Sequence, residues 1–164
     1  MKVAILSFSF KRGLLEDSNG NGGGFVFDCR AMPNPYWDET LRGYTGRDKP
    51  VADFFARFPE TVEPFLEATE TLVRQSIEQY KRDGRDHLQV AFGCTGNAPA
   101  AKRSGRPNAA RREPRSGRKG PRQHRSVYFA ERMAERLAII DGVEVEVMHT
   151  AKPCWKTETE GTNQ

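Results

Sequence analysis

The sequence has few cysteines and no long apolar run. Its three cysteines, Cys29, Cys94 and Cys154, are few and odd in number, which argues against a disulfide framework and fits a reducing compartment. No run reaches the roughly eighteen apolar residues that a membrane span needs, and residues 1–7 are too short and lack the small-residue cleavage site of a secretory signal. We therefore expect a cytoplasmic protein that does not enter a membrane.

Acidic residues are almost absent from residues 97–122, which we call the basic segment. It contains nine Lys or Arg residues and one acidic residue, a net charge of +8, whereas the rest of the chain carries 17 basic and 21 acidic residues, a net charge of −4. The segment has almost no bulky apolar residue, so burial cannot offset the entropy of ordering it, and we expect it to be disordered.

The charge of the basic segment suggests a nucleic-acid contact. Its cations could bind RNA or DNA phosphates without sequence preference, since it has no aromatic residue for base stacking. A solvated loop, or an artefact of the coding sequence, is the alternative. The candidate RNA-binding residues are Lys102, Arg103, Arg111, Arg112, Arg118 and Lys119.

Apolar periodicity predicts one α/β domain over residues 1–150, followed by a loose polar tail over residues 151–164. Strands are expected at residues 3–10, 25–27, 87–92 and 143–147, and helices at residues 50–58, 61–80 and 127–137. This order predicts a sheet with helical crossovers. Glutamates alternate with valines in the last strand, which indicates an edge position.

Two short motifs flank the basic segment and predict an anion pocket. Gly93–Gly96 ends a strand and Gln123–Ser126 opens a helix, so they become neighbours if the basic segment loops out. Thr95 and Gly96 belong to this turn, where glycine allows close approach of the backbone to an anion. The start of the helix adds free N–H groups and the positive end of its dipole.

Three side chains of the second motif suit an anion. Arg125 offers a bidentate fork to phosphate or carboxylate, Ser126 stands at the expected N-cap, and His124 can donate a hydrogen bond or titrate near neutral pH. Lys11 follows the first strand and can face the same site. A helix cap with an incidental arginine is the simpler alternative.

Cys94 raises an enzymatic alternative. Without the basic segment, its spacing to Arg125 resembles the phosphate loop of cysteine-dependent phosphatases, in which the thiolate attacks phosphorus. His124 is the other candidate for a phosphatase-like or sugar-phosphate-processing activity. No acidic general acid is identifiable, and a buried cysteine at a strand end is the simpler interpretation. We therefore predict no catalytic residue, no metal site and no cofactor.

Six ordered motifs carry a family resemblance. They are Ser7–Lys11, Val26–Arg30, Asn34–Asp38, Thr45–Val51, Gly93–Gly96 and Gln123–Val127. Together they resemble the C-terminal domain of the RNase adapter protein RapZ, over roughly residues 2–149 without the basic segment.

The resemblance implies a cytoplasmic bacterial α/β domain similar to a phosphofructokinase subdomain. In the best-known members the full protein also has an N-terminal P-loop domain that binds ATP or GTP. It is an oligomeric adaptor that presents a small RNA to RNase E and responds to glucosamine 6-phosphate, and the C-terminal domain carries RNA binding and the sugar-phosphate pocket. Carried over by motif, the ligand-site candidates are Lys11, Arg30, Tyr36, Thr95, Gly96, His124 and Arg125, and Ser126 joins them from the pattern above.

The sequence departs from the family at several places. It contains no Gly-x-x-x-x-Gly-Lys-Ser/Thr motif, so nucleotide hydrolysis is not implied, and a separate nucleotide-binding protein becomes a candidate partner. Ser9 stands where the family usually has glycine, and residues 148–152 replace its basic tail.

The leading prediction is a stand-alone domain that binds a sugar phosphate or a nucleotide-derived ligand, as a sensor or an RNA-binding adaptor. A homo-oligomer is a candidate assembly. A nonspecific RNA binder that acts through the basic segment alone is a third hypothesis.

Overall fold

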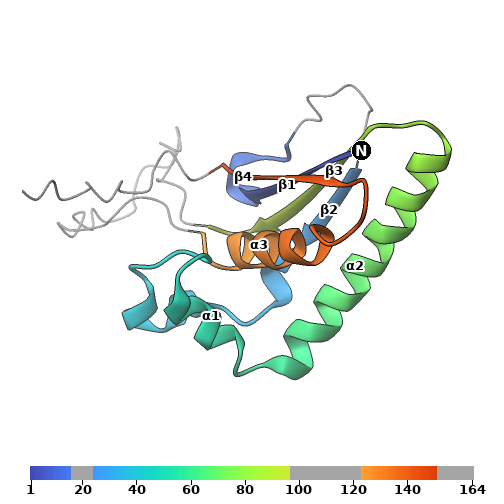
Figure 1. Cartoon of the computed structure of the whole chain (residues 1–164). Coiled ribbons are helices and arrows are strands. Elements are labelled where there is room, and N and C mark those ends of the chain that lie inside the picture. The colour runs from blue at the N-terminus through green and yellow to red at the C-terminus, as the bar shows by residue number, and fades with distance from the viewer. Residues whose placement is uncertain (16–23, 97–122, 151–164) are drawn as a thin grey trace, which may run out of the picture.

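The computed structural model describes residues 1–15, 24–96 and 123–150 (Figure 1). The predicted order of strands and helices is confirmed. The expected disordered segment (97–122) and loose tail (151–164) lie outside the described residues. The elements are β1 (Lys2–Ser9), β2 (Gly24–Asp28), α1 (Lys49–Phe55), α2 (Pro59–Arg82), β3 (His87–Cys94), α3 (Arg125–Leu137) and β4 (Glu144–His149).

The four strands form one parallel sheet in the order β2-β3-β1-β4. Parallel neighbours cannot be joined by a tight turn, and helices supply the longer connections. The segment with α1 and α2 leads from β2 to β3, and α3 follows β3 before the chain returns as β4. The predicted α/β sheet with helical crossovers is therefore confirmed. The predicted edge position of the last strand is also confirmed, and Glu144 and Glu146 of β4 are exposed.

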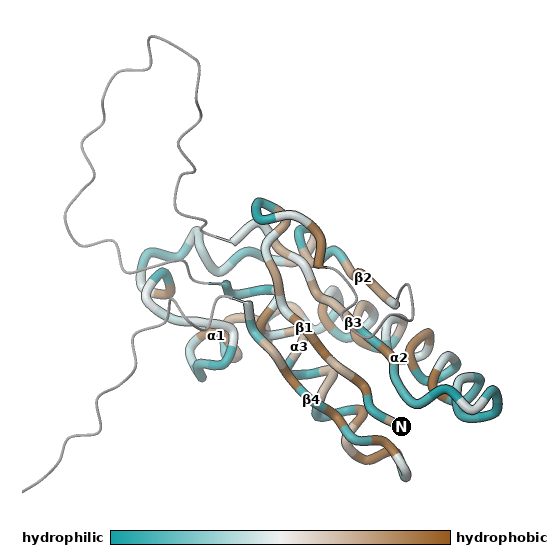
Figure 2. Tube along the Cα trace, turned by 90° about the horizontal axis from the view of Figure 1, so that it is seen from above, coloured by the Kyte–Doolittle hydropathy of each residue, from teal (hydrophilic) through white to brown (hydrophobic). Residues whose placement is uncertain are grey.

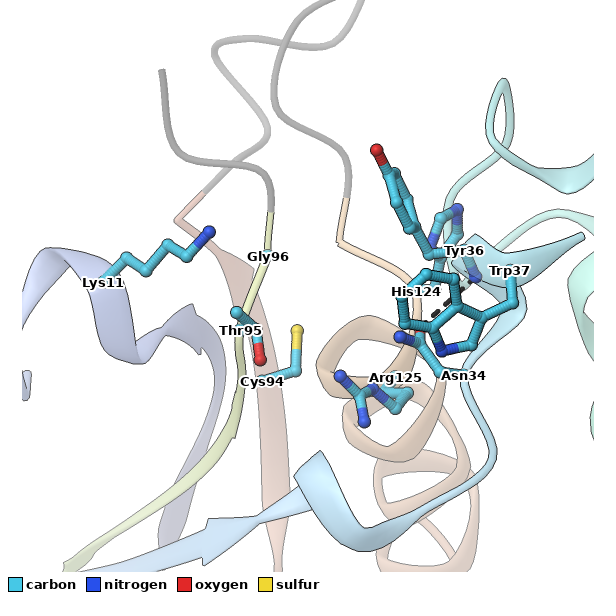
Figure 3. A pocket seen from close by; sticks show the side chains of 9 residues that line it. All are labelled: Lys11, Asn34, Tyr36, Trp37, Cys94, Thr95, Gly96, His124 and Arg125. Atoms are coloured by element: carbon cyan, nitrogen blue, oxygen red, sulfur yellow. Dashed lines mark hydrogen bonds between the residues drawn. The ribbon is translucent and has the colours of Figure 1, made fainter. Parts of the chain in front are cut away.

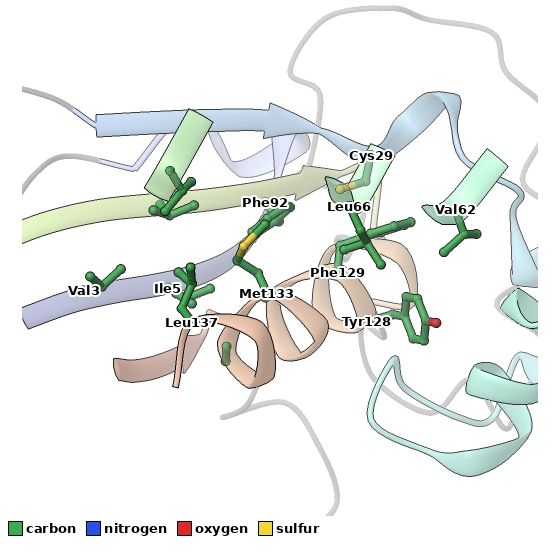
Figure 4. Close-up of a cluster of buried hydrophobic side chains, with 14 of the residues drawn as sticks. Val3, Ile5, Cys29, Val62, Leu66, Phe92, Tyr128, Phe129, Met133 and Leu137 are labelled. Atoms are coloured by element: carbon green, nitrogen blue, oxygen red, sulfur yellow. The ribbon is translucent and has the colours of Figure 1, made fainter. Parts of the chain in front are cut away.

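The core lies between the sheet and two helices, α2 and α3 (Figures 1 and 4). Residues of one face alternate along β1, so Val3 and Ile5 point to the helices. They belong to the same buried cluster as Phe129 and Met133 of α3, and full burial of such side chains contributes about 1.5–3 kcal/mol each. Apolar residues run along β1 and β3, whereas the turn after α2 is hydrophilic (Figure 2). None of the helices in the described part of the chain has the length and apolar character of a membrane span.

The loop between β2 and α1 packs against the start of α3. It contains three short 3-10 turns, Cys29–Ala31, Pro35–Trp37 and Glu39–Leu41. The Gly46 N–H donates to the carbonyl oxygen of Gln123 at 3.1 Å. A Cβ atom on Gly46 would lie 2.2 Å from the His124 carbonyl oxygen and from the Tyr128 nitrogen, so only glycine allows this approach.

We expect Gly46→Ala to destabilise the protein, because backbone atoms of α3 leave no room for a methyl group. The free energy of unfolding should fall by about 2 kcal/mol or more, measured by urea denaturation. Gly43→Ala in the same loop is the matched control, since no atom lies within 4 Å of a Cβ atom placed there. Equal stability of the two variants would contradict the packing described.

Candidate anion-binding site

A cavity of about 270 Å³ opens where β3 ends and α3 begins (Figure 3). Ligands of open α/β sheets commonly bind at this place, outside the carboxyl ends of the strands. Nine residues line the cavity: Lys11, Asn34, Tyr36, Trp37, Cys94, Thr95, Gly96, His124 and Arg125. Six of the eight predicted ligand residues are among them, and Arg30 and Ser126 are not.

The turn after β3 is held by Ser9. The Ser9 hydroxyl donates to the Thr95 carbonyl at 2.5 Å and accepts from the backbone N–H of Lys11 at 3.3 Å. One side chain therefore links the segment that carries Lys11 to the end of β3. Gly96 has a φ of +56°, in the left-handed region that favours glycine.

Arg125 is buried and held by backbone carbonyls. Its Nη1 donates to the carbonyl oxygens of Arg30 at 2.6 Å and of Met32 at 3.3 Å. Among the described residues, its Nη2 and Nε have no hydrogen-bond partner, so these atoms remain for a ligand. A guanidinium that is fixed in this way is preorganised for a planar anion.

The Arg30 side chain is not among the described residues that line the cavity, and its predicted contact with a ligand stays a prediction. It makes a bidentate pair with Asp28, with contacts of 2.6 and 2.9 Å, and stacks over the Phe10 ring at 4.3 Å. Its hydrogen bond to Asp28 lowers the pKa of that carboxyl. Arg30 therefore contributes to the site through its backbone carbonyl oxygen, which accepts the hydrogen bond from Arg125.

Ser126 lies beneath the cavity, and its prediction as the N-cap is wrong. The helix begins at Arg125, with His124 in the N-cap position and no side-chain cap. The Ser126 hydroxyl points inward instead, 3.1 Å from Cys94 Sγ and 3.4 Å from Gln123 Oε1. Hydrogen bonds from distant segments to the residues before Ser126 set the position at which α3 begins. Such bonds leave no pattern in the local sequence.

His124 is oriented by the loop before α1. Its Nε2 lies 3.1 Å from the carbonyl oxygen of Leu41. A carbonyl can only accept, so Nε2 carries a hydrogen. This bond fixes the His124 ring against the wall of the cavity. Figure 3 shows the ring beside Tyr36.

Asn34 and Trp37 line the cavity but were not predicted as ligand residues. Asn34 Oδ1 accepts from the Tyr36 N–H at 3.2 Å and caps the 3-10 turn. Trp37 is 76% exposed, and its ring lies edge-on to Tyr36, with 6.1 Å between the centroids. The sequence signal that could have identified Trp37 is a tryptophan in a polar loop. A tryptophan with a purely structural role would be packed against the core, whereas this ring is exposed.

The described part of the lining combines two cations with aromatic rings. Lys11 and Arg125 provide positive charge, and none of the lining residues in the described ranges is Asp or Glu. No group of metal-ligating side chains occurs among the described residues. The six candidate RNA-binding residues of the basic segment lie outside the described ranges. The arrangement can hold an anion that carries a ring.

Comparison with known proteins gives a consistent answer. A family model described as RapZ C-terminal domain matches residues 1–98. Nucleotide-binding protein BAV3158 of Bordetella avium is 38% identical over 136 residues, which cover 83% of this chain and 36% of that protein. A nucleotide-binding protein of Halorhodospira halophila is 37% identical over 137 residues, 84% of this chain and 37% of that protein. The chain thus spans little more than a third of the length of these relatives.

Proposed function

Since the chain belongs to the RapZ C-terminal domain family, we propose that it binds a phosphorylated small molecule in the cavity at the start of α3. A sugar phosphate is the leading ligand class, and a nucleotide-derived ligand is the second. The domain would act as a sensor or as an RNA-binding adaptor in the cytoplasm.

The observation that carries the proposal is the clamp on Arg125. Two backbone carbonyls fix its Nη1, so the other nitrogens are presented without further loss of side-chain entropy. Lys11 adds a second cation at the cavity. Charge-assisted hydrogen bonds from these groups would hold the phosphate oxygens.

The other lining residues suit the rest of the ligand. Thr95 and Gly96 offer hydrogen bonds at the end of β3, and His124 and Tyr36 would orient the bound molecule. The exposed Trp37 ring offers a flat apolar surface that a sugar or base face could cover. Ser126 would act from beneath the cavity and Arg30 through its carbonyl.

The names of the relatives suggest nucleotide binding, but they refer to proteins of greater length. The matched region covers 36% of the Bordetella avium protein. A separate nucleotide-binding partner protein and assembly into a homo-oligomer therefore belong to the proposal. RNA binding rests on the +8 charge of the basic segment, with Lys102, Arg103, Arg111, Arg112, Arg118 and Lys119 as its contacts.

The enzymatic alternative has one observation in its favour. Cys94 and His124 both line the cavity, as a phosphatase-like or sugar-phosphate-processing activity would need. Among the described residues, the lining offers no carboxylic acid to protonate a leaving group, and the Cys94 thiol is engaged with Ser126. We therefore favour binding over turnover.

We expect Arg125→Lys to weaken binding of glucosamine 6-phosphate by about tenfold or more, because lysine keeps the charge but loses the fork. Isothermal titration calorimetry and thermal shift measure the effect. Arg82→Ala at the far end of α2 is the control for loss of a cation. No binding of any sugar phosphate, nucleotide or phosphate by the wild-type protein would refute the proposal, and release of phosphate that Cys94→Ser abolishes would favour the enzyme.

We expect Trp37→Ala to distinguish the contribution of the sugar ring to binding from the contribution of the phosphate. Affinity for glucosamine 6-phosphate should fall roughly threefold to tenfold, because the ring loses its stacking surface. Affinity for inorganic phosphate should remain unchanged, since the cations are untouched. Equal losses for both probes would show that Trp37 shapes the anion site itself.

We expect deletion of residues 97–122 to abolish RNA binding and its salt dependence, because these residues hold most of the excess positive charge. Filter binding at two salt concentrations measures the effect. Affinity for glucosamine 6-phosphate in the same deletion variant is the control for folding. RNA binding that persists unchanged would remove the basic segment from the proposal.

A further inference from the structure

A continuous row of polar side chains runs through the core beneath the cavity, and we call it the buried polar chain. Its links are Cys94 Sγ to Ser126 Oγ at 3.1 Å, Ser126 Oγ to Gln123 Oε1 at 3.4 Å, Ser7 Oγ to Gln123 Oε1 at 3.3 Å, Ser7 Oγ to His149 Nδ1 at 2.8 Å, and His149 Nε2 to Glu131 Oε1 at 2.8 Å. It connects the cavity wall with the end of β4, and no role above accounts for Ser7 or His149.

The serine, histidine and glutamate of this chain look like a hydrolase triad, but their burial gives a different answer. Ser7 is completely buried and Gln123 nearly so, so no substrate can reach the Ser7 hydroxyl. The hydroxyl also faces Nδ1 and the carboxylate faces Nε2, the reverse of the usual order. The buried polar chain therefore positions other groups.

The connectivity shows which groups it positions. The Ser7 hydroxyl donates its one proton to Gln123 Oε1, so in its contact with His149 Nδ1 the Ser7 oxygen accepts, and a change at His149 changes how Ser7 is held against Gln123. Gln123 directly precedes His124 and Arg125, which line the cavity. Its carbonyl oxygen is held by the Gly46 N–H, so its side chain is the second anchor of the same residue.

The outer end of the buried polar chain is fixed as well. An ionised Glu131 can only accept, so Nε2 of His149 carries the hydrogen between them. Arg47 Nε contacts the same oxygen, Oε1, at 3.0 Å. Both nitrogens of the ring are thus committed, one to α3 and the other to β1, and the ring cannot turn without breaking a buried hydrogen bond.

We propose that His149 is a positioning residue for the ligand cavity, which it acts on through Ser7 and Gln123. Its Nδ1 edge holds Ser7, Ser7 holds the Gln123 side chain, and Gln123 sets the path of the chain into His124 and Arg125. The contact with Glu131 orients the ring. The effect on affinity rests on the proposed ligand site, whereas the effect on the conformation of residues 123–125 does not.

Two substitutions of His149 separate positioning from packing. Asparagine places its side-chain amide near the position of Nδ1 and can donate to the Ser7 oxygen there, whereas glutamine reaches toward Glu131 and leaves Ser7 without that partner. We expect His149→Asn to preserve the amide NMR shifts of residues 123–125 and the Gln123 side-chain amide shifts. His149→Gln and Ser7→Ala should both move these resonances. Combining His149→Gln with Ser7→Ala should shift these resonances little further than either change alone, because both changes remove the same contact.

Thr69→Val is the matched control, since it removes a buried hydroxyl of α2 that bonds only to backbone carbonyls in the described structure. It should lower the melting temperature and leave the shifts of residues 123–125 in place. Identical spectra for the asparagine and glutamine variants, or no change in Ser7→Ala, would overturn the inference.

Affinity provides the second readout. Titration with glucosamine 6-phosphate and with inorganic phosphate should show about threefold to tenfold weaker binding for His149→Gln and Ser7→Ala. His149→Asn should stay within about twofold of wild type. If the wild-type protein binds neither probe, the proposed function fails, while the NMR shifts still decide whether His149 positions Gln123 and Arg125.

Discussion

The turn that leads into α3, residues 123–125, is held at three successive residues by segments that are distant in the sequence. The Gly46 N–H binds the Gln123 carbonyl, and Nε2 of His124 meets the carbonyl oxygen of Leu41. The Arg30 and Met32 carbonyls hold Arg125. Because buried polar groups are costly to leave unpaired, these bonds leave the turn little freedom. The cavity exists where they place this turn against the end of β3.

This constraint explains why the site suits binding. The cations are presented on backbone segments that are fixed before any ligand arrives, so little order is lost on binding. The lining residues that the structure describes supply cations, hydroxyl and amide groups, a thiol and aromatic rings, but no carboxylate. Family membership supports the same interpretation, although the matched relatives are more than twice as long as this chain.

The sequence predicted most of the secondary structure, because apolar periodicity is a local property. It also predicted that the two motifs flanking the basic segment become neighbours if that segment loops out, and Thr95 and Gly96 do line one cavity with His124 and Arg125. The sequence could not show which contacts the Arg30 and Ser126 side chains make. Both residue types suit an anion site, but Arg30 pairs with Asp28 and stacks on Phe10, and the Ser126 hydroxyl faces Cys94 and Gln123.

The order of elements, the edge position of β4 and the pairing of the two motifs were thus determined by the sequence alone. Only the tertiary structure decided which side chains face the cavity and how Arg125 is held. It also revealed the buried polar chain through Ser7 and His149. The contact of Arg125 with Arg30 spans 95 residues, and that of Ser7 with His149 spans 142. Contacts over such separations depend on how the layers pack, and no local pattern of residues specifies them.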